Sequence, residues 1–213
     1  EGQALVVNVL PPTPTLPDSI LKVGCKPTEL ELVMRDPILC NSIAADGSDF
    51  VITGPTSVTI AGATQANCLN GQIKTIRIQL RRPVTLGGTY TVFIKQGSDG
   101  NTLMNACNIE SLPGESAAFT GYDSVLARID VGVKSSCEAD TLTFSNPGTN
   151  GINLWRWTEP GTSQTGNSPV YRRIYTTPGE VYMDLTVSNG VCTDSGKAVV
   201  NLSNLRIKAE FEY

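Results

Sequence analysis

The sequence contains no histidine. This absence excludes Ser-His-Asp and Cys-His nucleophiles and removes the imidazole ligands of the usual catalytic zinc site. Charge is also sparse, because Asp, Glu, Lys and Arg make up 17% of the chain and its net charge is −4. A nucleic-acid partner needs a clustered basic surface, which this composition does not favour. We therefore expect a protein that is not an enzyme, carries no cofactor and binds no nucleic acid.

Long apolar segments are missing as well. No apolar run approaches the roughly 18 residues that cross a bilayer, so membrane insertion is not expected. No segment keeps helical periodicity over three turns. The opening residues, EGQALVVNVLPP, have no feature of a signal peptide and look like a chain already under way.

The cysteines predict an oxidising compartment. Their number is even, their spacing is wide and no two form a CxxC pair: Cys25, Cys40, Cys68, Cys107, Cys137 and Cys192. This pattern fits zinc ligation or a redox dithiol poorly and structural disulfides well. We therefore expect an extracellular protein with three bridges. Six cysteines allow about 15 pairings, and their spacing does not choose among them.

The sequence is rich in turn residues and in alternating segments. It holds 20 glycines and 13 prolines, which separate these segments. Alternation of apolar and polar residues marks a strand with one buried face and one wet face. The apolar residues that share a face are Leu30, Leu32 and Met34; Ile76, Ile78 and Leu80; Tyr90, Val92 and Ile94; and Val181, Met183, Leu185 and Val187. Strands at intervals of about 8 to 12 residues predict an all-β fold of β-sandwiches.

Two segments interrupt the strand pattern and suggest the domain organisation. Residues 10–19 are proline-rich, which predicts an extended spacer. Residues 115–133 hold a short strand on each side of residues 121–124, and we place a domain boundary there. The predicted parts are 1–16, the end of a preceding module with its linker; 17–122, an immunoglobulin-like domain; 123–204, a second sandwich; and 205–213, the start of a next module or a tail.

Two acidic turns are candidates for a metal site. Asp46 and Asp49 lie in AADGSDFVITG, and Asp99 lies in the near-copy GSDGN. Their oxygens could bind calcium, although the order D-G-S-D lacks the spacing of a calcium loop and no closing Glu follows. The alternative is that these residues form ordinary turns, in which Asp caps the backbone and Gly supplies a positive φ. A glycosidase-like acid pair needs a sugar cleft, and nothing in the sequence offers one.

Tryptophans and arginine pairs form the other candidate sites. Trp155 and Trp157 lie two apart, on one face of a predicted strand. They could stack on a sugar, but we expect Trp157 to be the core tryptophan of a sandwich. The pairs at 81–82 and 172–173 are expected to be exposed charges that protect strand edges.

Two segments of the second half, CEADTLTFSNPGTNGINLWRW and SPVYRRIYTTPGEVYMDLTVSNGVCTDS, resemble a PKD (polycystic kidney disease-type) domain. PKD domains usually read W-x-F-G-D-G after the tryptophan strand, whereas this chain reads WRWTEPGTSQTG. In the first half, LCNSIAADGSDFVITG and GTYTVFIKQGSDGNTLMNAC are similar to immunoglobulin-like repeats of very long surface proteins in gliding bacteria. The resemblance implies two tandem immunoglobulin-like sandwiches, the second PKD-like, in a type IX-secreted adhesin or gliding-motility protein.

The resemblance further implies sites and partners. It implies disulfides that join Cys40 to Cys68, Cys25 to Cys107, and Cys137 to Cys192. Surface proteins of this group are often O-glycosylated at Asp-Ser or Asp-Thr before a small or aliphatic residue. This makes Ser19, Ser124 and Thr141 candidates. Neighbouring repeats of the same chain are the expected partners, with the secretion machinery or surface glycans as further ones.

Taken together, these features predict a non-catalytic stalk segment of a secreted bacterial surface adhesin, stiffened by disulfides. The alternative is a carbohydrate-binding accessory module of a secreted polysaccharide-degrading protein. Exposed, coplanar aromatic side chains on one sheet favour the alternative, and buried tryptophans favour the stalk.

Overall fold

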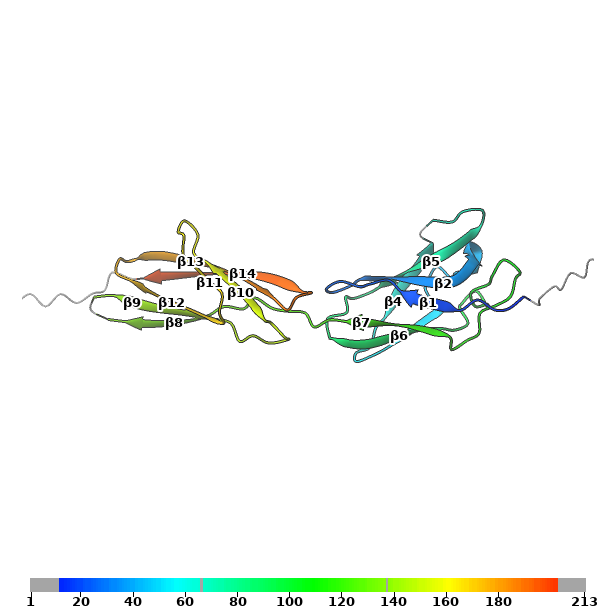
Figure 1. Cartoon of the computed structure of the whole chain (residues 1–213), viewed down its shortest axis with the longest axis horizontal. Coiled ribbons are helices and arrows are strands. Elements are labelled where there is room, and N and C mark those ends of the chain that lie inside the picture. Colours follow the sequence, from blue (N-terminus) through cyan, green and yellow to red (C-terminus); the bar gives the residue numbers. More distant parts are fainter. Residues whose placement is uncertain (1–11, 66, 137, 203–213) are drawn as a thin grey trace, which may run out of the picture. The chain divides into compact units, whose positions relative to one another are not determined.

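The computed structural model describes residues 12–65, 67–136 and 138–202. The chain divides into two compact units, Glu1–Tyr122 and Asp123–Tyr213, called below the first and the second unit. In the described residues the regular elements are antiparallel β-strands and one turn of 3-10 helix, η1 (Cys40–Ser42). The predicted all-β fold of two immunoglobulin-like sandwiches is thus confirmed (Figure 1). None of the helical structure described is long and apolar enough to cross a membrane.

The first unit is a sandwich of a four-stranded sheet and a three-stranded sheet. Their strand orders are β1-β2-β5-β4 and β3-β6-β7. Lettered in chain order, these are the sheets ABED and CFG of a constant-type immunoglobulin domain. The strands are β1 (Pro17–Ile20), β2 (Glu29–Leu39), β3 (Phe50–Thr53), β4 (Ile60–Gln65), β5 (Gln72–Leu80), β6 (Gly88–Ile94) and β7 (Ser116–Gly121).

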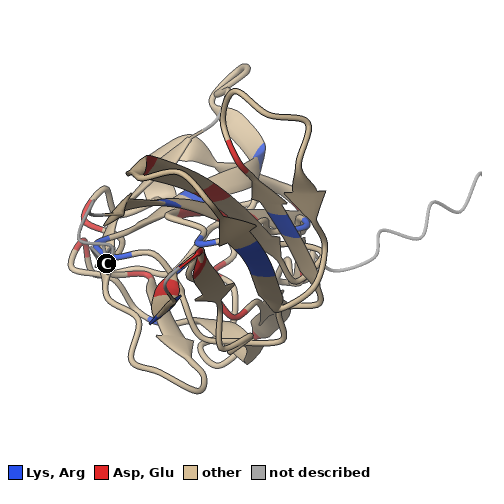
Figure 2. Ribbon diagram, turned by 90° about the vertical axis from the view of Figure 1, so that its left-hand side faces the viewer, with Lys and Arg blue, Asp and Glu red and all other residues tan. Residues whose placement is uncertain are grey.

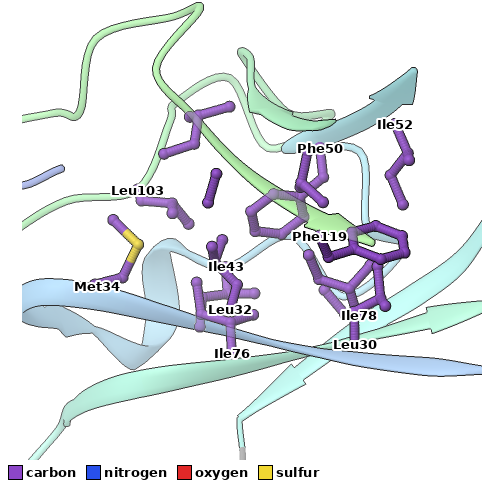
Figure 3. Close-up of a cluster of buried hydrophobic side chains, with 14 of the residues drawn as sticks. Leu30, Leu32, Met34, Ile43, Phe50, Ile52, Ile76, Ile78, Leu103 and Phe119 are labelled. Carbon is purple, nitrogen blue, oxygen red and sulfur yellow. The ribbon is translucent and has the colours of Figure 1, made fainter. Parts of the chain in front are cut away.

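The core of the first unit lies between these sheets, and the alternating residues form it as predicted. Leu30, Leu32 and Met34 of β2 are all 1% exposed or less. They pack in one cluster with Phe50 of β3 and Phe119 of β7, from the facing sheet (Figure 3). Each such side chain contributes about 1.5 to 3 kcal/mol when it leaves water, so this layer is the main source of the unit's stability.

Tyr90 of β6 forms a tyrosine corner. Its hydroxyl donates a hydrogen bond to the carbonyl of Leu86, four residues upstream (3.1 Å). Its ring stacks on Phe119 with centroids 5.3 Å apart. The two edges of the ring fill the space where a Cβ at Gly54 or Gly121 would stand, 2.1 and 2.8 Å from the nearest ring carbon. Both glycines are therefore required by the fully buried ring, although neither has a positive φ.

The predicted spacer is wrong for residues 13–19, because residues 13–16 pack against the sandwich of the first unit and residues 17–19 belong to β1. Thr15 is 1% exposed, and its hydroxyl accepts the N–H of Asp36 (3.1 Å). Its carbonyl accepts the hydroxyl of Ser111 (2.9 Å), and the Asn105 amide donates to the Thr13 carbonyl (2.9 Å). The prolines keep the segment extended, but its threonines hydrogen-bond the unit. Residues 1–11 and 203–213, and with them the predicted start of a next module, lie outside the described range.

The second unit is also a sandwich, with three strands in one sheet and four in the other (Figure 1). The strand orders are β12-β9-β8 and β11-β10-β13-β14. In the first unit the fourth strand, β4, pairs with β5, whereas the fourth strand here, β11, pairs with β10 in the opposite sheet. The strands are β8 (Asp130–Ser135), β9 (Asp140–Ser145), β10 (Leu154–Thr158), β11 (Thr165–Gly166), β12 (Val170–Tyr175), β13 (Gly179–Ser188) and β14 (Thr193–Leu202).

The core of the second unit is built around Trp157 of β10, which is fully buried. Its indole N–H donates to the Ser168 carbonyl (2.8 Å), and its ring lies 6.3 Å from that of Phe144 on β9. Met183 and Leu185 of β13 are also fully buried, as the alternation predicts. This is the buried tryptophan of an immunoglobulin-like sandwich, in the third strand of its unit.

Of the predicted disulfides, the bond between Cys40 and Cys68 is present, with the Cα atoms 6.2 Å apart. Cys25 and Cys192 are also disulfide-bonded. Cys137, the predicted partner of Cys192, lies outside the described residues.

The predicted Cys25–Cys107 bond is wrong, because Cys107 is a free and exposed thiol. Cys107 follows Asn105, which forms a bridge with Ile38 near the end of β2. Cys25 precedes the start of the same strand. The 11 residues of β2 extend over roughly 35 Å, whereas a disulfide needs Cα atoms within about 7 Å.

Candidate functional site

The two acidic turns of the sequence meet in the first unit. Each contains the tripeptide Gly-Ser-Asp, at residues 47–49 before β3 and at residues 97–99 after β6. Strands β3 and β6 are paired, with Phe50 opposite Ile94, so the turns lie at the same end of one sheet. The backbone N–H of Lys95 also donates to the Asp49 carbonyl (2.8 Å). The near-repetition therefore places two copies of one turn side by side.

Asp46 joins the two turns by hydrogen bonds. One carboxylate oxygen accepts the N–H and the hydroxyl of Ser48 (2.9 and 2.6 Å), and the other accepts the hydroxyl of Ser98 (2.8 Å). The Ser98 N–H donates in turn to the Ser48 hydroxyl (2.7 Å). The bonds from Ser48 are the main reason why the pKa of Asp46 lies below its ordinary value. Asp46 is thus an ionised cap, as the turn interpretation predicts for it.

Asp49 is different, because its side chain is fully buried. Its Oδ2 accepts the N–H of Ala44 (2.7 Å), whereas its Oδ1 is buried without a hydrogen-bond partner. Burial, together with the nearby charges of Asp99 and Asp46, raises the pKa of Asp49 to about 6. A buried carboxylate oxygen without a donor is costly, so this position needs an explanation beyond turn formation.

The unpartnered oxygen points to the backbone of the second turn. A Cβ atom on Gly97 would stand 2.3 Å from Asp49 Oδ1 and 2.7 Å from Asp99 Oδ1. Both carboxylates therefore approach the point that the absent side chain leaves open. Asn101 closes this turn by accepting the Gly97 N–H at its carbonyl (2.8 Å), and its own side-chain Oδ1 is also buried without a donor.

Chemically, this arrangement offers oxygen acceptors and few donors. Across residues 12–65, 67–136 and 138–202, no three or more His, Cys, Asp or Glu side chains are grouped so as to hold a metal ion. Two carboxylate oxygens lie beside Gly97, and Asn101 of the same turn adds a buried amide oxygen without a donor. A proton or a hard cation is the species that such oxygens take up.

Without a divalent cation, the stability of the first unit should fall as the pH rises from about 4 to about 6. In this window the folded unit keeps the Asp49 proton, while the unfolded chain, with a pKa near 3.8, has released it. The loss should reach roughly 1 to 3 kcal/mol above pH 7, at about 1.4 kcal/mol per pKa unit. Thermal unfolding in chelator over this pH range measures it. Asp49→Asn should remove this component, and exposed Asp18→Asn should keep it; identical pH profiles for all three proteins would contradict the assignment.

Trp155 lines a hollow on the second unit but is not a free platform. The hollow has a volume of about 900 Å³, and Arg156, Thr165, Asn167 and Thr186 are among the residues around it. The Trp155 side chain is half-buried, and its indole N–H donates to Asn146 Oδ1 (3.1 Å). Trp157, two residues further along the same strand, is a core residue.

The arginine pairs have different environments. Arg81 and Arg82 are exposed, as predicted, and so is Arg172. The prediction is wrong for Arg173, which is half-buried, forms an ion pair with buried Glu159 and lies 5.3 Å from the ring centre of Tyr175. Arg173 lies on β12 and Glu159 follows β10, so the pair joins the two sheets of the second unit. Elsewhere, positive and negative residues are interspersed along the strands (Figure 2).

The three glycosylation candidates occupy different positions. Ser19 is half-buried in the edge strand β1, and its hydroxyl donates to Asp18 (3.0 Å). Ser124 is half-buried outside the strands, and its carbonyl accepts the Asn150 amide (2.7 Å). Thr141 is half-buried in β9, the middle strand of its sheet. Whether any of them is modified stays a prediction.

No protein-family model matches the chain, and no curated protein matches it. Among solved structures, it is similar to the N-terminal part of the bacterial S-layer protein SbsC, with a TM-score of 0.40 and 17% identity over 90% of this chain and 45% of that one. It is also similar to a segment of two fibronectin type III domains from chicken tenascin, with a TM-score of 0.35 and 11% identity over 87% and 99%. The chain spans less than half of the S-layer structure, and similarities this weak assign it to no family.

Proposed function

We propose that this chain is a non-catalytic structural segment of a protein exposed outside the cell. The observation that supports this most is that each unit has two antiparallel sheets and a hydrophobic core between them. Disulfides at Cys40–Cys68, Cys25 and Cys192 support an oxidising compartment. The lack of histidine fits a role without acid–base or nucleophilic chemistry.

In this role the function of the chain is mechanical. Paired strands must break several backbone hydrogen bonds together when the chain is pulled, and β2 and β5 are among the longer pairs of the first unit. The Cys40–Cys68 bond limits how far an opened first unit can extend, because the residues between the two cysteines stay closed in a loop. The segment would thus carry load and resist proteolysis.

Two measurements test this proposal. Antibodies against the chain should label intact cells of the source organism, and labelling only after lysis would overturn the assignment to the cell exterior. In single-molecule pulling of the reduced full chain, two separate unfolding events are expected, one for each unit. A chain that lengthens smoothly without such events would contradict a load-bearing role.

A finer assignment rests on the resemblance of the sequence to repeats of gliding bacteria. We propose that the parent protein is a type IX-secreted adhesin or gliding-motility protein, with this segment in its stalk. The expected observation is a type IX sorting domain at the end of the full-length protein. Loss of surface display when the type IX route is inactivated is also expected, and unchanged display would exclude this route.

A second candidate function is carbohydrate binding, favoured by the hollow beside Trp155 on the second unit. The Trp155 side chain is on the face of β10 that also carries core Trp157, so the polar residues of the hollow, such as Arg156 and Thr186, would bind the hydroxyls of a sugar. If the hollow binds a glycan, Arg156→Ala should raise the Kd by about tenfold or more. A glycan array followed by titration measures this, with Tyr182→Ala as a control, an exposed aromatic of β13 outside the lining named above. No binding on the array would remove this candidate.

A further inference from the structure

We propose that the two Gly-Ser-Asp turns of the first unit form a calcium site, with Asp49, Asp99 and Asn101 as its side-chain ligands. The inference is independent of the proposed surface role. It rests on the geometry around Gly97 and on the two buried oxygens that lack donors.

Asp49 provides the strongest support. A fully buried carboxylate oxygen without a donor occurs rarely in folded proteins, because its desolvation is not compensated. Capping explains only one of the two Asp49 oxygens, because the Ala44 N–H donates to Oδ2 and not to Oδ1. Its Oδ1 lies instead beside Gly97, where Asp99 Oδ1 also lies. A cation bound between these two oxygens would neutralise two carboxylates that otherwise repel each other.

The surrounding turns supply a framework for such an ion. Asn101 contributes a second buried oxygen without a donor, and its carbonyl holds Gly97 in place. The hydrogen bonds from Ser48 and Ser98 to Asp46 fix the two turns against each other and keep a third negative charge close by. Gly97 carries no side chain, which leaves room for both carboxylates, because a Cβ there would stand 2.3 Å from Asp49 Oδ1 and 2.7 Å from Asp99 Oδ1.

The ligand chemistry selects calcium and predicts a weak site. Carboxylate and amide oxygens are hard ligands, and Ca²⁺ accepts six to eight of them in irregular geometry, whereas Mg²⁺ demands a near-ideal octahedron. Three side-chain oxygens leave several positions to backbone carbonyls and water. We therefore expect a Kd on the order of 10⁻⁴ to 10⁻³ M, the range of extracellular calcium modules.

The test is calorimetric unfolding of the full chain near pH 7.5, in millimolar CaCl₂ and in chelator. Tryptophan fluorescence, measured in parallel, identifies the two transitions. Both tryptophans lie in the second unit, so the transition that leaves their fluorescence unchanged belongs to the first unit. At about 10 mM, roughly 10 to 100 times the expected Kd, calcium should raise the Tm of this transition by about 5 °C or more and leave the other in place. Titration calorimetry should give one ion per chain. No calcium-dependent shift, or an equal shift with MgCl₂, would overturn the proposal.

Two variants are directed at the ligands of the site. Asp99→Asn changes an exposed ligand and should abolish most of the calcium shift. Gly97→Ala is compatible with the backbone, because this φ is not positive, but its methyl group would stand 2.3 and 2.7 Å from the two carboxylate oxygens and displace both ligands. The matched control is Asp18→Asn, an exposed acid of the same unit, which should keep the full shift. Wild-type calcium responses in both site variants would contradict the assignment.

A third variant separates a cation ligand from a purely structural acid. In Asp49→Asn the amide can still accept the Ala44 N–H, while the buried charge is removed. In chelator this variant should melt at or above the wild-type Tm, and calcium should no longer raise it. A structural role alone predicts a lower Tm under both conditions, and that result would also reject the site.

Discussion

Trp157→Ala should unfold the second unit at a temperature roughly 15 to 30 °C below that of the wild type and leave the first unit unchanged. Replacing a fully buried tryptophan with alanine costs about 3 to 5 kcal/mol, through lost contacts and the cavity that remains. The contacts with Phe144 and the hydrogen bond to the Ser168 carbonyl are lost together. For a unit of this size, each kcal/mol lowers the Tm by about 4 to 8 °C.

Calorimetry and circular dichroism of the full chain measure this effect, since the first unit provides an internal reference. Trp155→Ala is the matched control, because Trp155 is only half-buried and should cost much less. Trp157→Phe should have an intermediate effect, because it keeps the ring but loses the bond to Ser168. Equal losses at positions 155 and 157 would show that Trp157 is not the core residue described.

Replacing both Cys40 and Cys68 with alanine should destabilise the first unit by about 3.5 kcal/mol. This value follows from the entropy of closing a loop with a sequence separation of 28 residues, and it is an upper estimate. Without the disulfide, two hydrogen bonds still hold residues on either side of Cys68 to the backbone of Cys40. The Gln65 side chain donates to the Cys40 carbonyl (2.6 Å), and the Cys40 N–H donates to Gly71 (2.9 Å).

Denaturant unfolding of the full chain measures the loss as a shift in the midpoint of the transition that belongs to the first unit. The control is Cys107→Ala, because this thiol is free and exposed, and the change should stay within about 0.5 kcal/mol. Reducing agent should lower the denaturant midpoint of the first unit in the wild type and should affect the double variant less. A double variant as stable as the wild type would mean that the hydrogen bonds alone hold this loop.

The sequence predicts the cores well, because alternation in a half-buried strand follows directly from its geometry. Leu30, Leu32 and Met34 are buried as predicted, and so are Met183 and Leu185. These buried positions can be predicted without knowing which strand pairs with their own. What alternation does not contain is the sheet in which a strand lies, and so the exchange of the fourth strand between sheets could not be predicted.

The candidate site depends on contacts between distant residues, which a local pattern does not contain. Asp46 and Asp49 lie in the same short turn, yet the first is an exposed cap and the second is buried with one side-chain oxygen unpaired. In the sequence, only the recurrence of Gly-Ser-Asp indicates that the two turns are related. The Cys25–Cys107 pairing failed for the same reason, since it came from resemblance and not from the length of β2.

Tyr90 and its two glycines have a consequence for the search for relatives. The ring occupies the space beside Gly54 and Gly121, so these three positions, distant in sequence, are restricted as a group. A larger residue at position 54 or 121 should be tolerated only where position 90 has become smaller. Sequences that have diverged too far for overall identity to be informative should still show this covariation. The trio thus provides a three-position signature by which distant homologues of the first unit could be collected.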